Sequence, residues 1–247
     1  MNMREFQNAI HRKLLEHGWR VQRAAPAPQG WEQDRAYWEP AYLRRLGFRP
    51  RTIIDVGVAH GTPQLYAAFP DAQLILVEPV AEFSEGIAQI LARRRGVLIP
   101  AAAWSSEGEL ELRAELDGSE GSSHYSRNPL DSTGHTPRPR RVPVTTIDRI
   151  IANHAFPEPF GLKIDTEGAE LEVIRGAAAT LERTLFVIAE VSVLHNRFEG
   201  SYSFAQFIAA MDQAGFEVCD QLSIARCRSS SRISFVDLVF QRRGNSP

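Results

Sequence analysis

The residues of this chain best suited to chemistry are a glycine-rich turn and the acid that precedes it. The segment Ile53–Gly61 reads IIDVGVAHG, in which an apolar run reaches Asp55 and then breaks at Gly57. Doubly wound α/β folds build a nucleotide pocket from a buried strand, a glycine turn and a helix, because glycine lets the backbone approach a ligand closely. The third glycine of the dinucleotide fingerprint is absent, and Asp55 would repel a pyrophosphate. The turn therefore predicts a cationic or hydroxyl-rich ligand.

A second acid stands at the end of the next predicted strand. Glu78 follows Asp55 at roughly the 20-residue spacing at which such folds place an acid for the ribose hydroxyls. A carboxylate suits both hydroxyls because it offers two acceptor oxygens and no donor. The alternative is that Glu78 caps the loop that begins at Pro79. The glycine turn upstream favours ribose binding.

The densest group of acids follows another predicted strand, in the segment Lys163–Glu170, which reads KIDTEGAE. Asp165 and Glu167 lie at the strand-to-helix turn, and Glu167 and Glu170 share a helix face. Three interpretations stay open. The acids cap free N–H groups at a helix N-terminus, one of them removes a proton from a substrate hydroxyl, or they bind a divalent cation.

A histidine is a further candidate for the general base. His195 follows the fifth predicted strand, at the same end of the sheet as the acids. Imidazole titrates near neutral pH, which suits removal of a proton from a hydroxyl. A loop histidine without a catalytic task is the alternative interpretation.

A long polar loop interrupts the strand and helix pattern over residues 117–141. Loops of this length inside a compact domain are usually functional or disordered. We expect the loop to close over the substrate, or else to be an ordinary flexible excursion. Its expected hydrogen-bond donors are Ser122, Ser123 and Tyr125, and its weaker candidate bases are His124 and His135.

Alternating strands and helices must position these residues. The predicted strands are residues 52–56, 74–77, 97–99, 161–165 and 185–191, with a closing pair at 216–219 and 234–240. The predicted helices are residues 62–69, 80–94, 146–153, 168–183 and 203–214, and additional extended segments are residues 110–113 and 142–144. Repeated strand–helix units with a final hairpin predict an α/β fold with a mainly parallel sheet and an antiparallel strand at or near one edge.

The first 50 residues predict a helical extension. Residues 4–19 carry apolar side chains at helical spacing, a loop follows at 24–30, and a second helix is expected over 34–46. Such an extension would form a dimer surface, cover the pocket or shield one side of the sheet. We therefore divide the chain into a helical extension, residues 1–50, and an α/β domain, residues 51–247.

The composition excludes several classes of protein. The 247 residues include 28 basic and 30 acidic side chains, with a net charge of −2, so nothing predicts a nucleic-acid partner. Two cysteines are too few for a disulfide framework and fit a reducing compartment. No apolar run is long enough to span a membrane, and the N-terminus lacks the apolar region of a signal peptide. We expect a cytoplasmic protein.

The chain resembles the FkbM-type family of S-adenosylmethionine-dependent methyltransferases from about Ile53 to Arg242. The most specific match is LKIDTEGAELEVIRGA, which is similar to the family signature K-I-D-x-E-G-x-E-x-x-x-L-x-G, with Ile174 in place of leucine. The other matching segments are IIDVGVAHG, LILVEP, AAAWSSEGELEL, GSSH, VPVTTID, FVIAEVS and FVDLVFQRR.

The resemblance implies a Rossmann-like class I methyltransferase fold with a seven-stranded, mainly parallel sheet and a C-terminal antiparallel hairpin. It implies S-adenosylmethionine as the methyl donor and O-methylation of a hydroxyl of a sugar, a surface glycan or a secondary metabolite. The residues that it places around the donor are Asp55, Gly57 and Gly61 on the methionine and ribose side, Glu78 at the ribose, Ala102 and Ala103 near the adenine, and Asp165 beside the sulfonium and the acceptor. His60 stands in the same turn, where the family commonly has a small or polar residue.

Two rival functions remain open at this stage. The first is a nicotinamide-dependent oxidoreductase, against which the missing third glycine argues. The second is a binding protein that kept the fold without turnover, against which Asp55, Glu78 and Asp165 argue. For an O-methyltransferase, the candidate bases are Asp165, Glu167 and His195.

Overall fold

The computed structural model describes residues 31–35, 37–114, 123, 125–127, 138–194 and 197–244. The helix expected over residues 4–19 lies outside these ranges. The candidate residues His195, His124, His135 and Ser122 lie outside them as well.

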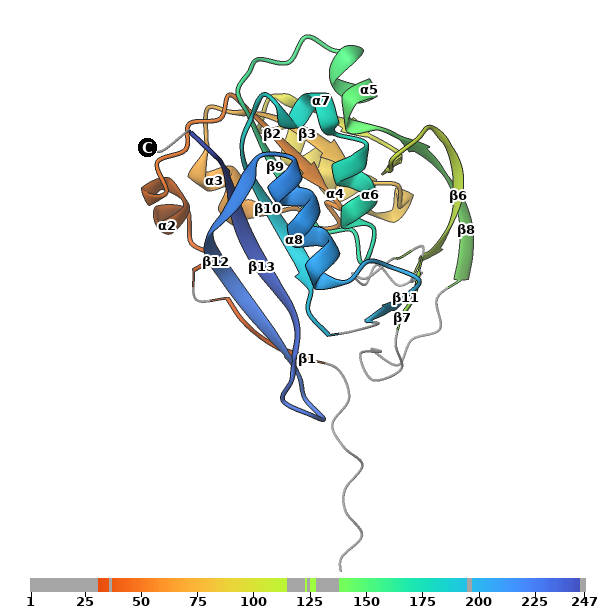
Figure 1. Cartoon of the computed structure of the whole chain (residues 1–247). Coiled ribbons are helices and arrows are strands. Elements are labelled where there is room, and N and C mark those ends of the chain that lie inside the picture. The colour runs from red at the N-terminus through yellow and green to blue at the C-terminus, as the bar shows by residue number, and fades with distance from the viewer. Residues whose placement is uncertain are drawn as a thin grey trace, which may run out of the picture.

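An eight-stranded sheet forms the centre of the molecule, in the order β1-β12-β13-β10-β9-β2-β3-β4 (Figure 1). In that order the strands are Trp31–Asp34, Phe216–Cys227, Ile233–Arg242, Thr184–Ser192, Phe160–Ile164, Thr52–Val56, Gln73–Val77 and Gly96–Ile99. Strands β10, β9, β2, β3 and β4 are mutually parallel. Strand β13 is antiparallel to both of its neighbours. The expected Rossmann-like sheet with a C-terminal antiparallel hairpin is confirmed.

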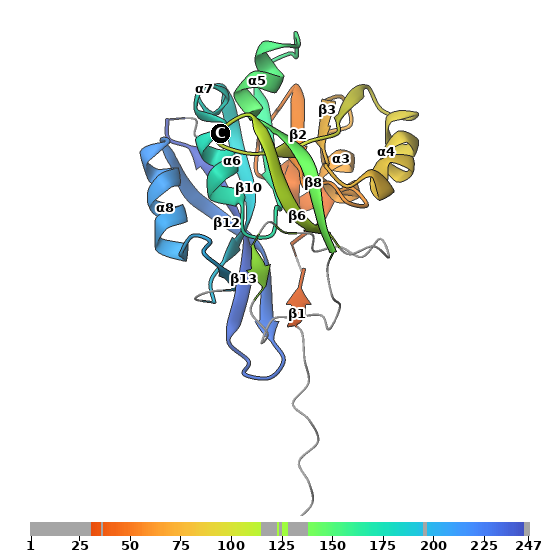
Figure 2. The same ribbon diagram turned by 90° about the vertical axis from the view of Figure 1, so that its right-hand side faces the viewer.

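Helices cover both faces of this sheet, as Figure 2 shows for α6, α7 and α8 on one side and α3 and α4 on the other. The first face carries α5 (Ile147–Ala152), α6 (Glu170–Arg175), α7 (Ala178–Leu181) and α8 (Phe204–Gln213). The second face carries α2 (Pro40–Arg45), α3 (Pro63–Ala68) and α4 (Ser84–Leu91), with a 3-10 turn η1 at Ala81–Phe83.

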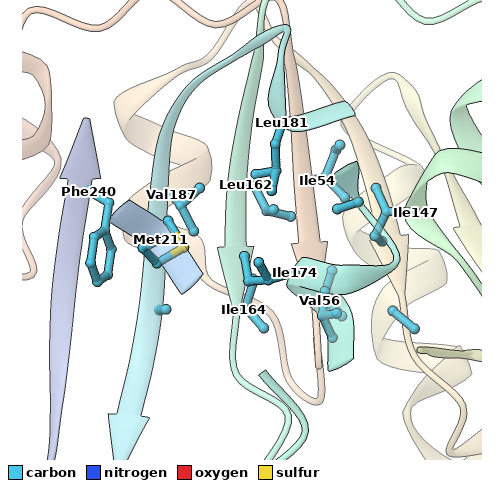
Figure 3. Packing of buried hydrophobic residues seen from close by; sticks show 14 of the residues in the cluster. Ile54, Val56, Ile147, Leu162, Ile164, Ile174, Leu181, Val187, Met211 and Phe240 are labelled. Atoms are coloured by element: carbon cyan, nitrogen blue, oxygen red, sulfur yellow. The ribbon is translucent and has the colours of Figure 1, made fainter. Parts of the chain in front are cut away.

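Alternation along each strand divides the core between the two faces. In β2, Ile54 and Val56 pack against α5, α6 and α7 in the cluster drawn in Figure 3, whereas Ile53 packs on the α2, α3 and α4 side. All five residues of β2 are buried. A strand covered on both faces reads as a continuous apolar run, which is why Asp55 stands out within it.

The described residues before β2 do not form the purely helical extension that the sequence predicted. The helix predicted over 34–46 is shorter and begins at Pro40, which suits the first helical position because proline lacks an N–H. Residues Trp31–Asp34 form strand β1 instead, antiparallel to β12. The sheet therefore gains an eighth strand at its edge.

The helix predicted over 168–183 is two helices. Helix α6 ends at Arg175 and α7 begins at Ala178. The break lies at Gly176, where a Cβ atom would meet the carbonyl oxygen of Trp104 at 2.0 Å. A close approach of the loop after β5 therefore interrupts the helix.

A small second sheet contains the other extended segments, in the order β5-β8-β6. Its strands are Ala102–Ala103, Arg138–Thr145 and Gly108–Ala114, and β6 and β8 run alongside each other in Figure 2. A short pair links β7 (Ser126–Arg127) to β11 (Phe198–Glu199). Among the described residues, no helix combines the length and apolar composition needed to cross a bilayer.

Candidate ligand-binding site

A pocket lies at the carboxyl ends of the parallel strands, where open α/β sheets bind ligands. Of the residues predicted from the sequence, its lining contains Gly57, Gly61, Glu78, Ala102, Ala103, Asp165 and Glu167. The structure therefore brings together residues from the turn after β2, the ends of β3 and β9, and the small second sheet. Asp55 and His60 are not in the lining formed by the described residues.

Glu78 follows β3 directly and ties the glycine turn to the sheet. Its Oε2 accepts a hydrogen bond of 2.8 Å from the N–H of Ala59, and its Oε1 accepts one of 2.9 Å from the N–H of Val80. Burial raises the pKa of Glu78, while these two hydrogen bonds oppose the rise. The carboxylate thus caps the loop, as one interpretation expected, and it also faces the pocket.

Gly57 is required where the turn passes the end of β9. Its φ is +77°, and a Cβ atom there would lie 1.7 Å from the carbonyl oxygen of Asp165. Its own N–H donates to the carbonyl of Val77 at 3.0 Å. Glycine at position 57 therefore lets the ends of β2, β3 and β9 pack closely against one another.

Asp55 was expected beside the ligand and instead lies beneath the pocket. Its side chain is fully buried and accepts hydrogen bonds from the hydroxyls of Thr62 (3.0 Å) and Tyr66 (2.5 Å). Its Oδ1 lies 3.5 Å from Nζ of Lys163 and has no hydrogen bond. The contact is an ion pair without hydrogen-bond geometry, so Asp55 holds the start of α3 and balances the charge of Lys163.

His60, the other predicted residue outside the lining, is exposed. Its ring packs edge-on against Phe83, with the ring centroids 5.1 Å apart. Phe83 itself lines the pocket. His60 therefore contacts a residue of the pocket wall, and its contact with the donor stays a prediction.

Lys163 connects the buried acid to the pocket acid. Its Nζ lies 3.3 Å from both the carbonyl of Gly57 and Oδ2 of Asp165. Burial by itself lowers the pKa of Lys163, but Asp165 and Asp55 outweigh it, so the pKa lies above its ordinary value. Lys163 therefore stays charged and orients Asp165.

The capping interpretation of the KIDTEGAE segment holds for Glu170. This buried carboxylate accepts hydrogen bonds from the N–H groups of Thr166 (2.9 Å) and Gly168 (3.1 Å) and from the hydroxyl of Tyr202 (2.6 Å). It lies behind the turn and holds it. Asp165 and Glu167, on the same turn, face the pocket.

Glu167 shares a buried cation with a second acid. Arg197 donates to Glu167 at 3.1 Å and to Glu190 on β10 at 2.6 Å. Its guanidinium also lies over the rings of Phe198 and Phe235, at 4.8 and 4.1 Å from their centroids. Burial raises the pKa of Glu190 well above its ordinary value, and Arg197 opposes that rise.

Three acids in this region could together bind the divalent cation that one interpretation of the sequence expected. Carboxylate oxygens of Asp165, Glu167 and Glu190 lie within 4.8 Å of one another. Arg197 already supplies a positive charge to two of them. Electrostatic balance of the cluster therefore does not require a metal ion.

Strand register places three acids side by side across the sheet. Glu190 pairs with Asp237 on β13. Ile164 pairs with Ala189, so Asp165 follows beside Glu190. Directly opposed residues point to the same face, and all three acids line the pocket. We call Asp165, Glu190 and Asp237 the acidic row.

Asp237 closes the row on the side of the N-terminal segment. Its Oδ2 accepts hydrogen bonds from Nε1 of Trp38 (2.7 Å), Oγ of Ser223 (2.5 Å) and Nε2 of Gln33 (3.4 Å). Burial is the main cause that raises the pKa of Asp237. Trp38 and Gln33 also line the pocket, so the segment around β1 forms one wall.

Sequence reasoning missed Glu190, Asp237, Arg197, Trp38 and Gln33. For the two acids a signal existed, because each stands alone in an apolar strand, in LFVIAEV and SFVDLVF. A carboxylate in such a strand must be paired or face a cavity. Trp38 and Gln33 gave no such signal because strand β1 was not predicted.

Two residues of the polar loop were expected to donate to the substrate. Ser123 instead donates to the carbonyl of Glu167 at 2.5 Å and accepts from the N–H of Tyr125. Tyr125 stacks on Trp104, with centroids 6.3 Å apart. Neither Ser123 nor Tyr125 belongs to the pocket lining formed by the described residues.

The pocket is acidic. Among the described residues that line it, five are acidic, namely Glu78, Asp165, Glu167, Glu190 and Asp237, and two are basic, namely Arg35 and Lys163. Lys163 and three of the acids are already ion-paired. The balance favours a ligand with positive charge and hydroxyl groups over a pyrophosphate.

Comparison with known proteins identifies a family whose model matches most of the chain. A family model described as the methyltransferase FkbM domain matches residues 55–218. A curated relative, hexuronic acid methyltransferase AglP of Haloferax volcanii, is 26% identical over 141 residues, which are 56% of this chain and 54% of the relative. The chain thus spans about half the length of that relative.

Two solved structures to which the chain is similar share little sequence with it. The methyltransferase FkbM of Methylobacillus flagellatus is 15% identical, with a TM-score of 0.47 over 82% of this chain and 50% of that chain. The fibrillarin of Aeropyrum pernix, with bound S-adenosylmethionine, is 11% identical, with a TM-score of 0.45 over 82% of this chain and 76% of that one.

Proposed function

Since this chain belongs to the FkbM methyltransferase family, we propose that it transfers a methyl group from S-adenosylmethionine to a hydroxyl of a sugar, a surface glycan or a secondary metabolite. The observation that carries the proposal is the acidic pocket at the strand ends, with Glu78 and Asp165 on opposite sides of Gly57. The donor, when bound, supplies a methyl group that its sulfonium already activates.

The donor fits the residues on the β2, β3 and β9 side of the pocket. Glu78 offers carboxylate oxygens for the ribose hydroxyls. Val80, Phe83 and Ala102 form an apolar wall suited to the adenine. Asp165, held by Lys163, offers negative charge to the sulfonium and to the amino group of the methionine.

A sugar acceptor fits the opposite side. Hydroxyl-rich ligands suit a wall of carboxylates with aromatic rings, and Trp38 and Trp104 both line the pocket. The curated relative is described as a hexuronic acid methyltransferase. A sugar acid also carries a carboxylate, and Arg35 lies in the lining with its Nε bound to Gln33 at 2.7 Å. Among the described acids none forms an ion pair with Arg35, which leaves its Nη groups for that carboxylate.

For methyl transfer the protein mainly aligns the acceptor oxygen with the methyl group and the sulfur, which removes an entropic cost from the reaction. Alignment of the acceptor requires that the side chains lining the pocket are held in place. Glu190 and Glu167 are held by Arg197, and Asp165 is held by Lys163. The pocket walls are therefore fixed before the ligands bind.

Two measurements test the proposal. Isothermal titration calorimetry with S-adenosylmethionine and, separately, NADH should show binding of the first alone. Transfer of a tritiated methyl group to a panel of sugars, including D-glucuronic acid, methyl α-D-glucopyranoside and N-acetyl-D-glucosamine, should then label at least one of them. Binding without transfer to any hydroxyl would favour the binding protein that kept the fold.

A further inference from the structure

The acid at the acceptor side of the pocket differs from the other acids in the lining. Asp165, Glu167 and Glu190 each have a cationic partner, and Glu78 uses both oxygens in hydrogen bonds to the backbone. Asp237 receives all of its hydrogen bonds on Oδ2, from neutral donors. Within the described chain, Asp237 therefore combines an unpaired charge with an oxygen that no donor reaches.

That oxygen is open to the pocket. Asp237 belongs to the lining. Among the described residues, the side-chain atoms that are buried from solvent and also lack a hydrogen bond are Oδ1 of Asp55 and Nε of Arg242. Oδ1 of Asp237 lacks a hydrogen bond but is not among these buried atoms, so it is accessible. The protein thus fixes one oxygen of this pocket-lining carboxylate with three donors and leaves the other accessible and without a hydrogen bond.

We propose that Asp237 is the general base of the reaction, with Trp38 and Ser223 as its positioning residues. The inference rests on the proposed function. As the acceptor oxygen forms its bond to the methyl carbon, the carbon–sulfur bond breaks and its electron pair stays on sulfur. The hydroxyl proton passes to Oδ1 of Asp237, which later releases it to water. S-Adenosylhomocysteine and a methyl ether are the products.

The surroundings suit a base. Burial and the nearby Asp165 raise the pKa of Asp237, whereas Ser223, Trp38 and Lys163 lower it, and the net direction is upward. Glu190 is the neighbour across the strand pair, and its charge is directed to Arg197. A carboxylate with a raised pKa takes a proton from a hydroxyl more readily than an ordinary one.

The two sides of the pocket draw on different parts of the chain to different degrees. Gly57, Glu78 and Asp165 fall within the segment 55–218 that the family model matches, whereas Trp38 and Asp237 fall outside it. The donor side is thus built from the family segment. The acceptor side combines β1, the loop to α2 and β13 with Trp104 from within the matched segment, and its Asp237 lies in the segment FVDLVFQRR that resembles the family.

The base also selects the kind of acceptor oxygen. A carboxylate acceptor needs no base, and its charge would be repelled by Oδ1 of Asp237. A hydroxyl both donates its proton to Oδ1 and gains nucleophilicity. The reaction should therefore give an alkali-stable ether and not an alkali-labile ester, even on a sugar acid that offers both groups.

Asp237→Asn is the direct test, because an amide can keep an oxygen toward Trp38 and Ser223 while placing NH₂ toward the acceptor. Transfer of the tritiated methyl group to the sugar panel should show kcat about 10²–10⁴-fold lower. The affinity for S-adenosylhomocysteine, by calorimetry, should stay within about twofold. The matched control is Asp212→Asn on the exposed face of α8, which should leave both quantities unchanged.

Ser223→Ala supplies a second readout that needs the carboxylate intact. It removes a hydrogen bond that lowers the pKa of Asp237, so the acidic limb of the kcat profile should move to higher pH. Activity is lost as the pH falls through that pKa, since a protonated Asp237 cannot accept the proton. An unmoved limb would show that another group is the base, even if Asp237→Asn failed to fold.

The outcomes separate the two proposals. If wild-type protein labels a hydroxyl and Asp237→Asn retains kcat within about threefold, the base assignment is wrong and the proposed function stands. Label that mild alkali releases as methanol would overturn the hydroxyl acceptor. Wild-type protein that labels no sugar hydroxyl would overturn the proposed function, and the base assignment with it.

Discussion

The Glu78 carboxylate accepts a hydrogen bond of 2.8 Å from the backbone N–H of Ala59, so the acid at the end of β3 holds the glycine turn that follows β2. Ala59 has a positive φ of 43°, which an alanine adopts only where its surroundings hold it. The acid proposed to bind ribose therefore also shapes the glycine turn that lines the pocket.

Replacing Glu78 should weaken binding of the donor. In Glu78→Ala, S-adenosylmethionine loses its ribose acceptor and the turn loses its support, so the dissociation constant by calorimetry should rise at least about tenfold. Glu78→Gln is the matched control and should fall between Ala and wild type, because the amide keeps one acceptor oxygen. Unchanged affinity in Glu78→Ala would remove Glu78 from the donor site.

Removing Lys163 should destabilise the protein. Lys163→Met leaves Asp55 fully buried without its ion pair, and breaking a buried pair typically costs about 3–5 kcal/mol. The free energy of unfolding in urea measures the loss. Arg183→Met breaks an exposed pair with Glu158 and should cost at most about 1 kcal/mol. Equal losses in the two variants would contradict the role given to Lys163.

A methyl group at Gly57 should disrupt the pocket. In Gly57→Ala the new Cβ would lie 1.7 Å from the carbonyl of Asp165, at a φ of +77°, so strand ends must separate. Both the unfolding temperature and the affinity for S-adenosylmethionine should fall. Gly86→Ala, on α4 with no atom near its Cβ, should instead stabilise by about 0.5–1 kcal/mol. A Gly57→Ala protein that binds the donor as wild type would contradict this geometry.

Methyl transfer should survive removal of divalent cations. Arg197 balances Glu167 and Glu190, so we expect EDTA to leave kcat within about twofold. Arg197→Met should abolish transfer, because two acids would then face each other without a cation. Loss of activity in EDTA, restored by Mg²⁺ or Mn²⁺, would show instead that the cluster binds a metal.

Arg35 should distinguish sugar acids from neutral sugars. With D-glucuronic acid as the acceptor, Arg35→Ala should raise KM about tenfold, since a charge-assisted hydrogen bond to a carboxylate is lost. With methyl α-D-glucopyranoside, KM should hardly change. Arg35→Lys should retain part of the preference because its charge is kept. Equal effects on the two acceptors would remove the carboxylate contact.

The side of the pocket proposed for the donor could be predicted from the sequence because its residues follow local rules. Gly57, Glu78 and Asp165 each stand where a strand ends, and in a parallel sheet those ends meet at one edge. That rule did not predict that the side chain of Asp55 is buried away from the pocket. It lies two residues before Gly57, one step deeper in the sheet, and its burial depends on Lys163 of a neighbouring strand.

The contacts on the side proposed for the acceptor could not be predicted, since they join residues far apart in the chain. Trp38 and Asp237 are 199 residues apart and meet because β1 pairs with the far edge of the C-terminal hairpin. A four-residue strand with one partner carries little local pattern. The domain boundary at residue 50 and the role of the first 30 residues remain predictions.

One measurement tests the central claim most directly. The purified protein is incubated with S-adenosylmethionine and D-glucuronic acid or a neutral methyl glycoside, and the products are followed by mass spectrometry. The proposed function predicts that S-adenosylhomocysteine forms in step with a sugar whose mass has increased by one methylene group and whose new ether survives alkali. Donor that binds without forming either product, across the whole panel of sugar hydroxyls, would contradict it.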